Sequence, residues 1–122
     1  MDKSFSFLGI CRRAGKLLIG EDGVSGAARS GEARLLMVAS DTADNNRKKA
    51  LNLGRWYRIP VVKLPWDKDT LGELLDKRVC AILALTDKGL AAAFLEKLAA
   101  DHPGYGEPEA AEKTAWKGRT KE

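Results

Sequence analysis

The sequence has few of the residues from which metal centres and nucleophilic active sites are built. Among 122 residues there are two cysteines and one histidine, too few to assemble a zinc or haem ligand set. Cys11 and Cys80 stand far apart among apolar neighbours, which predicts small core residues in a reducing cytoplasm. His102 precedes Pro103 with no orienting carboxylate evident, so we interpret it as a surface histidine.

Long apolar runs are also absent. The longest, residues 79–85 and 90–95, are far shorter than the roughly 20 residues of a membrane-spanning helix. The first four residues do not begin a secretory signal, and no GxxxxGK(S/T) phosphate loop occurs. Most aspartates fall at expected helix starts, where capping accounts for them. We therefore expect a cytoplasmic protein with no membrane association, cofactor, metal or enzymatic activity.

Charge is unevenly distributed along the chain. The net charge is +4, and hydrophobic residues make up 44% of the chain, as expected of one globular domain. Residues 1–63 hold 12 Lys and Arg against 6 Asp and Glu, whereas residues 64–122 hold 9 against 11. This asymmetry indicates one positive face suited to a phosphate polyanion. An ordinary solvated surface is the plainer alternative.

Apolar runs alternate with helical patterns along the chain. Continuous runs at 35–39, 59–64 and 79–85 predict buried strands. Helical spacing predicts helices over about 4–14, 22–30, 41–57, 71–75 and 88–100, the first capped by Ser4 and the third by Asp41 or Thr42. This order predicts a three-layer α/β/α sandwich with a mostly parallel sheet. Residues 1–100 are expected to form one domain. Residues 101–122 are expected to form a mobile polar tail, with Trp116 packed on the body.

The stretch at 20–26 contains Gly20, Gly23 and Gly26. In a helix Gly23 and Gly26 each cost about 1 kcal/mol relative to alanine. Either the helix is pressed tightly onto its sheet, or a partner's backbone approaches the exposed N–H groups at its positive end. Glu21 and Asp22 between these glycines are suited to accepting hydrogen bonds from the exocyclic amines of bases.

Two groups of cations lie in the basic half: Arg47, Lys48 and Lys49 in the third helix, and Arg12, Arg13 and Lys16 around the first turn. A solvated helix face explains either group alone, and their shared location in the basic half favours nucleic acid for the set. Trp56 and Tyr57 follow apolar spacing, so we expect them to fill the core rather than stack on bases.

Several motifs follow one another in a familiar order: Arg13-Ala14-Gly15-Lys16, then Gly20, Val24, Ala27-Ala28, Gly31, Ala33, residues 35–39 and Asp41, then Ile59-Pro60-Val61, Lys68-Asp69-Thr70-Leu71-Gly72 and residues 79–86. Over about residues 4–98, this order and spacing resemble the L7Ae/L30e/S12e family of ribosomal proteins that bind kink-turn RNA, and especially its small bacterial YlxQ-like branch. The resemblance implies a four-stranded mixed sheet in which residues 17–19 form the additional strand.

Members of that family bind RNA internal loops through two segments. One is the start of the second helix, Gly-Thr-Asn-Glu-x-x-Lys, and the other is a loop, Lys-x-x-Leu-Gly-x-Ala-x-Gly. Four positions match these segments: Gly20, Lys68, Leu71 and Gly72. Among the positions that depart from them, Asp22, Gly23 and Gly26 replace Asn, Glu and Lys, while Leu74 and Asp76 replace Ala and the second Gly. The departures remove side chains that read bases.

The resemblance implies a non-enzymatic RNA-binding protein that associates with ribosomal or another structured non-coding RNA, with ribosomal proteins as further partners. Its expected RNA-binding residues are Lys16, Gly20, Glu21, Asp22, Gly23, Arg47, Lys48, Lys68, Leu71 and Gly72. Cations would contact phosphates, the amides of residues 20–23 would set the register, and Leu71 would contact a flipped base. The alternatives are an adaptor that has lost kink-turn specificity, a domain like the accessory part of ribosomal-RNA methyltransferases, and a small-ligand enzyme.

Overall fold

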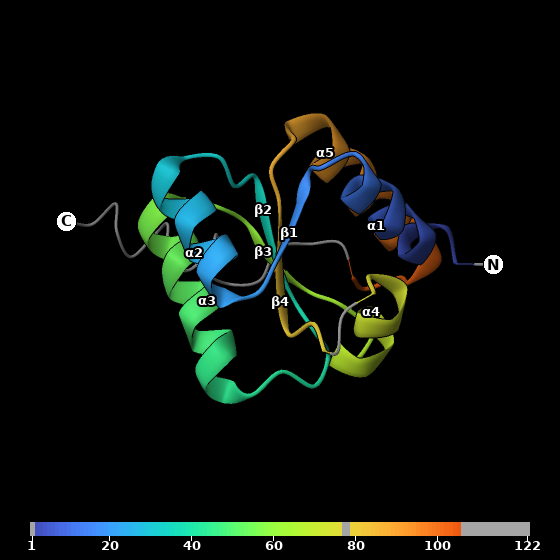
Figure 1. Ribbon diagram of the computed structural model, residues 1–122. Coiled ribbons are helices and arrows are strands. Elements are labelled where there is room, and N and C mark those ends of the chain that lie inside the picture. The colour runs from blue at the N-terminus through green and yellow to red at the C-terminus, as the bar shows by residue number, and fades with distance from the viewer. Residues whose placement is uncertain (1, 77–78, 106–122) are drawn as a thin grey trace.

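The computed structural model describes residues 2–76 and 79–105. Over these residues helices and strands alternate along the chain (Figure 1). In order they are α1 (Lys3–Arg13), β1 (Leu17–Ile19), α2 (Glu21–Ser30), β2 (Leu35–Val38), α3 (Asp44–Tyr57), β3 (Val61–Lys63), α4 (Lys68–Leu74), β4 (Ile82–Leu85) and α5 (Lys88–Asp101). None of these helices is both long and apolar enough to cross a membrane.

The four strands form one mixed sheet in the order β1-β4-β2-β3, and β1 is the additional strand that the family resemblance implies. Strands β1, β2 and β3 run in one direction, but β4 lies between β1 and β2 and is antiparallel to both. Only the β2–β3 pairing is parallel, which corrects the expectation of mostly parallel pairing. The reason is the short helix α4: the N–H of Cys80 donates to the carbonyl of Lys68. Strand β4 therefore begins at the same edge of the sheet as α4 and runs in the direction opposite to the other strands.

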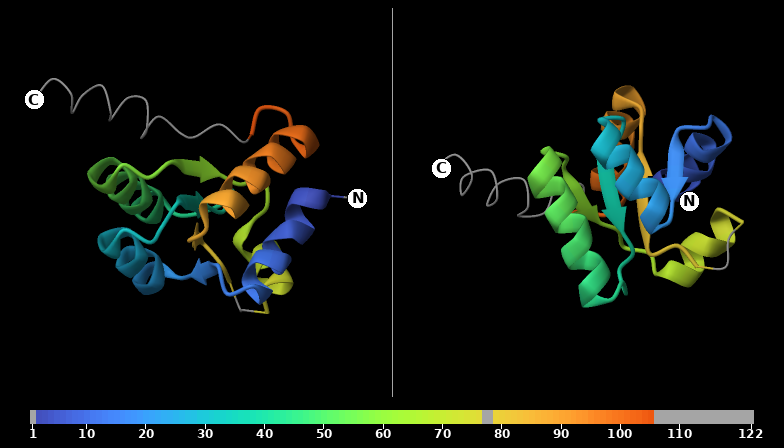
Figure 2. Two further views of the ribbon diagram at one scale, coloured as in Figure 1. Left: turned by 90° about the horizontal axis from the view of Figure 1, so that it is seen from above. Right: turned by 60° about the vertical axis from the view of Figure 1, so that its left-hand side comes forward.

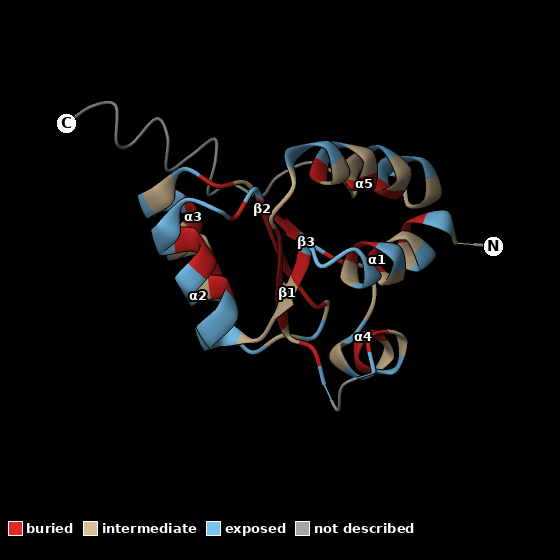
Figure 3. Ribbon diagram, turned by 45° about the horizontal axis from the view of Figure 1, so that its top comes forward, coloured by how far each residue is buried: buried red, intermediate tan, exposed pale blue. Residues whose placement is uncertain are grey.

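Helices cover both faces of this sheet, which confirms the predicted α/β/α sandwich. Helices α2 and α3 lie on one face, and α1, α4 and α5 on the other (Figures 1 and 2). Strand β2 is buried throughout, as predicted, because Leu36 and Val38 face the first pair of helices while Leu35 and Met37 face the other three. Figure 3 shows this buried sheet between helices whose outer sides are exposed. Both cysteines are buried, as predicted.

Helix α3 packs very closely on β3 at Gly54. A Cβ atom at this position would lie 2.5 Å from Val61 Cγ2 and 2.6 Å from the carbonyl oxygen of Ile59. Because a backbone oxygen cannot move aside cheaply, only glycine allows this approach. Gly54 thus fixes the helix that carries part of the candidate site.

The N-terminal cap of α1 is Asp2 rather than the expected Ser4. Its Oδ1 accepts hydrogen bonds from Phe5 N–H (3.0 Å) and the Ser4 hydroxyl (2.7 Å). Its Oδ2 lies 2.6 Å from His102 Nε2 and accepts from Trp66 Nε1 at 3.3 Å. Partial burial alone would raise the pKa of Asp2, but the bonds from Ser4, Phe5 and His102 outweigh it and hold that pKa well below its usual range.

His102 is therefore a structural residue, which corrects its interpretation as a surface histidine. Its ring is half-buried and packs edge-on against Trp66 and Tyr105. The packed chain thus extends past residue 100, since the Ser4 N–H also donates to Asp101 Oδ2. Residues 106–122 of the tail expected over 101–122, including Trp116, lie outside the described residues.

Candidate functional site

Three helices begin at one edge of the sheet, which we call the α2–α3–α4 edge and which lies at the lower end of Figure 1. Strands β1, β2 and β3 end there, and β4 begins there. Gly20 N–H donates to the carbonyl of Ile82 at 3.0 Å. The N–H of Lys68, the first residue of α4, donates to Asp41 Oδ1 at 2.9 Å. These bonds hold the starts of α2 and α4 to the rest of the edge.

Helices α2 and α3 begin without a side-chain cap among the described residues. Gly20 precedes α2 with a φ of 97°, and Ala43 precedes α3. The expected caps of α3, Asp41 and Thr42, precede the cap position, which Ala43 occupies. Asp41 instead accepts a hydrogen bond from the N–H of Lys68 at the start of α4. The first N–H groups of both helices thus lack a capping acceptor, and their positive dipole ends share one edge.

The glycines of α2 are exposed and are not required by packing. A Cβ atom at Gly26 would meet no described atom within 4 Å, and one at Gly23 would meet only Leu18 Cβ, at an ordinary 3.8 Å. Tight packing on the sheet therefore does not explain either glycine. The backbone at both positions is open to solvent.

Three of the expected cations lie near helix starts at the same edge as Gly20. Arg47 and Lys48 lie in the first turns of α3, and Lys68 begins α4. Lys48 is exposed and the other two are half-buried. Lys16 is not brought there: its carbonyl accepts from Thr86 N–H at the opposite edge of the sheet, beside the start of β1.

Two acidic side chains at the α2–α3–α4 edge, those of Glu21 and Asp67, are engaged within the protein. Glu21 Oε2 forms an ion pair with Lys49 Nζ at 2.7 Å, which links α2 to α3. Asp67 caps α4 by accepting from Thr70 N–H at 2.7 Å, and this bond is the main reason that its pKa is lowered. Asp22, Asp44 and Asp69 are exposed in the first turns of α2, α3 and α4. The edge therefore presents cations and helix starts together with these three carboxylates.

Leu71 and Gly72 do not contribute a surface. Both are buried, with Leu71 0% exposed in the core cluster beneath α4. Because Leu71 fills the space between α4 and the sheet, it cannot offer an apolar surface to a flipped base, which corrects that expectation. Within the matched loop segment, Lys68 retains an accessible side chain at the edge.

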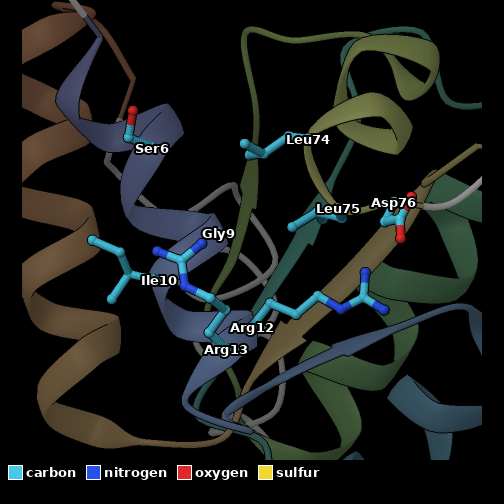
Figure 4. Close-up of a pocket in the computed structure, with 8 residues that line it drawn as sticks. All are labelled: Ser6, Gly9, Ile10, Arg12, Arg13, Leu74, Leu75 and Asp76. Carbon is cyan, nitrogen blue, oxygen red and sulfur yellow. The ribbon is translucent and has the colours of Figure 1, made fainter.

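Arg12 and Arg13 line a separate pocket of about 580 Å³ between α1 and α4. Figure 4 shows Arg12 extended along this pocket toward Asp76, while Arg13 points back along α1 toward Ile10. The Nη1 atom of Arg12 is buried with no described hydrogen-bond partner. Both arginines therefore line the pocket between α1 and α4 and not the α2–α3–α4 edge.

Trp56, expected in the core, lies on the surface. Its side chain is 72% exposed, whereas Ala50 and Gly54 form the buried face of α3. A position two residues after Gly54 falls outside that face, so the helical period was the signal that could have shown Trp56 to be external. Tyr57, half-buried, packs against the core as expected.

Neither Ser4 nor Cys11 is arranged as an activated nucleophile. The Ser4 hydroxyl donates to Asp2 rather than to His102, so the histidine does not activate it. Burial, followed by the charge of Asp87, raises the pKa of the Cys11 thiol, which keeps it protonated. Within residues 2–76 and 79–105, no three His, Cys, Asp or Glu side chains are placed to hold a metal.

Relatives and solved structures resemble this chain over most of its length. A curated relative, "RNA-binding protein YlxQ" of Bacillus subtilis (strain 168), is 32% identical over 87 residues, 71% of this chain and 86% of that protein. The protein of that name from Enterococcus faecium is 32% identical over 62 residues, 51% of this chain and 60% of that protein. A solved structure of a Bacillus halodurans protein of unknown function matches with a TM-score of 0.74 and 30% identity, over 80% of this chain and 98% of that one.

Residues 2–94 match a family described as the ribosomal protein L7Ae/L30e/S12e/Gadd45 family. The matched range contains every element from α1 to β4 and part of α5. It also contains the α2–α3–α4 edge with all of its cations. The chain belongs to the ribosomal protein L7Ae/L30e/S12e/Gadd45 family.

Proposed function

We propose that this protein binds structured RNA in the cytoplasm without a catalytic step, docking the α2–α3–α4 edge on a kinked segment of ribosomal or other non-coding RNA. The observation that carries the proposal is the start of α2. Its exposed glycines serve no packing purpose and lie at the same edge as Arg47, Lys48 and Lys68. The curated relatives, both named RNA-binding proteins, support it.

Affinity comes from contacts to phosphate groups. Arg47, Lys48 and Lys68 neutralise phosphates and release their counterions. The uncapped N–H groups at the starts of α2 and α3 donate to further phosphate oxygens. Since these donors belong to rigid helix ends, they also fix the orientation of the RNA on the protein.

Recognition of the kink rests on shape more than on base-reading side chains. Gly23 and Gly26 stand where the family has Glu and Lys, so a nucleotide backbone can reach α2 directly. Asp22, exposed at this end, accepts a hydrogen bond from an exocyclic amine of a base. A kinked backbone presents closely spaced phosphates to this small edge, whereas a straight duplex does not. Ribosomal proteins are further partners in this proposal.

The test compares a kink-turn RNA with a matched plain duplex over a salt series. We expect tighter binding to the kinked RNA, with an affinity that falls steeply as salt rises, by roughly two to three logarithmic units per tenfold increase for three phosphate contacts. Equal affinity for the two RNAs would overturn the docking proposal. If neither RNA binds at low salt, the adaptor function of the same fold takes its place.

A further inference from the structure

Helix α3 presents a polar and aromatic stripe toward α2. Lys49, Asn52, Leu53 and Trp56 recur at the spacing of one helix face. They line a groove of about 620 Å³ between the two helices. Trp56 is 72% exposed there, although its large apolar ring would gain much from burial. Trp56 therefore offers an accessible aromatic face beside the groove.

The groove continues directly from the α2–α3–α4 edge. Glu21, the first residue of α2, and Ser25 form its second wall, and Ile82, the first residue of β4, also lines it. Ile82 is the residue whose carbonyl accepts the Gly20 N–H. The groove extends along α3 from Lys49 to Trp56, about 10 Å at 1.5 Å per residue. A chain docked at Gly20 could therefore enter it without a break.

Charge favours a polyanion over an acidic or neutral peptide in this groove. Lys49 and Arg55 line it against the single carboxylate of Glu21. The Lys49–Glu21 ion pair is 2.7 Å long, but both side chains are about half exposed. Exposed ion pairs contribute little to stability. Lys49 can therefore turn from Glu21 to a phosphate at small cost.

We infer that this groove holds a single-stranded segment of RNA that flanks the kinked site, with one base stacked on Trp56 and a phosphate on Lys49. The inference rests on the proposed function. The indole stacks on any base, and the Asn52 amide both donates to and accepts from base edges. The segment is recognised with little sequence preference because stacking does not depend on the identity of the base.

The first experiment uses two forms of one kink-turn RNA, with and without a short single-stranded extension. We expect the extension to raise the affinity of the full-length protein about tenfold. Trp56→Ala removes this gain and leaves the affinity for the unextended RNA unchanged, while Trp56→Phe, which keeps a ring, retains most of the gain. An extension without effect, or an equal gain in Trp56→Ala, would overturn the inference. Because Trp56 is mostly in solvent, both variants should fold, which thermal unfolding verifies.

A second experiment separates this inference from the proposed function. The fluorescence anisotropy of a labelled single-stranded adenosine oligonucleotide measures binding to the groove in the absence of kinked RNA. Binding by the unmodified protein that Trp56→Ala loses supports the groove even if the kinked RNA does not bind. Equal binding by the two proteins, or no binding by either, contradicts it. Self-association that depends on Trp56, without oligonucleotide binding, would assign the groove to a second copy of the chain.

Discussion

Gly26 occupies the interior of a helix at a point that no other described part of the molecule approaches. A glycine there costs about 1 kcal/mol relative to alanine, and nothing in the packing requires it. Gly54 shows the opposite case, because Val61 and Ile59 leave no room for a Cβ atom. The contrast separates a glycine kept for the fold from one that leaves backbone exposed at the candidate site.

Gly26→Ala should therefore raise stability and lower RNA affinity together. The added methyl group meets no neighbour and favours the helix, by up to about 1 kcal/mol in the free energy of unfolding. At the same time it lies where a nucleotide backbone would approach α2. Chemical denaturation and RNA titration of the same protein measure the two effects.

Gly9→Ala is the matched control for this prediction. Gly9 lies within α1, where a Cβ atom would make an ordinary 3.6 Å contact with Leu74 Cδ1. This variant should also gain stability but bind RNA as the unmodified protein does. Unchanged RNA affinity in Gly26→Ala would show that the bare backbone of α2 has no part in binding.

Lys68→Glu should weaken RNA binding several-fold without unfolding the protein. The structural contacts of Lys68 are made by its backbone, whose N–H donates to Asp41 and whose carbonyl accepts from Cys80. A change of side chain spares both bonds but reverses a charge at the edge, and the salt dependence should lose about one phosphate contact. The melting temperature and a salt series test this. Retained affinity would remove Lys68 from the interface.

The ends of the helices determine which residues meet in this protein. Helix α1 is capped by Asp2, whose carboxylate also forms hydrogen bonds with Trp66 and His102 from distant parts of the chain. Helices α2 and α3 begin without side-chain caps, so their first N–H groups have no side-chain acceptor among the described residues. The capped start belongs to the fold, whereas the two uncapped starts belong to the candidate site.

Stability should depend on pH through the carboxylate of Asp2. Because its pKa is lowered in the folded protein, the stabilisation is present above the ordinary aspartate pKa, near 3.8, and is lost as pH falls further. Asp2→Asn should therefore be less stable than the unmodified protein near neutral pH, and the difference should shrink in acid. Denaturation at several pH values measures it. A difference that stays constant down to about pH 2, or an equal effect of the exposed-site control Glu32→Gln, would contradict this assignment.

Local patterns predicted most of the elements but not all of their contacts, and β1 was expected only from the family resemblance. The buried strand β2 and the left-handed stop of α2 at Gly31 follow from an apolar run and a glycine, and both are present. The pairing of β4 was missed because the return of the chain after α4 depends on a bond between residues 68 and 80. The role of His102 was missed for a similar reason, since its partner Asp2 lies 100 residues away.

At the scale of the whole molecule, the sheet places Lys16 at the edge opposite to Arg47 and Lys48. Lys16 and Gly20 are only four residues apart, yet β1 carries them to opposite edges. Arg47 and Lys48 are far from Gly20 in sequence but share its edge. Sequence spacing alone could identify a basic half, whereas the direction of each strand decides which cations act together.

The most direct test of the proposed interface compares Lys48→Glu with Lys16→Glu. Both replace one exposed lysine by glutamate, so both change the net charge equally, but at opposite edges of the sheet. Binding of the kink-turn RNA is measured for each over the same salt series. We predict that Lys48→Glu loses affinity at least tenfold more than Lys16→Glu and reduces the salt dependence by about one contact. Equal losses in the two variants would show that net charge, rather than the α2–α3–α4 edge, governs binding.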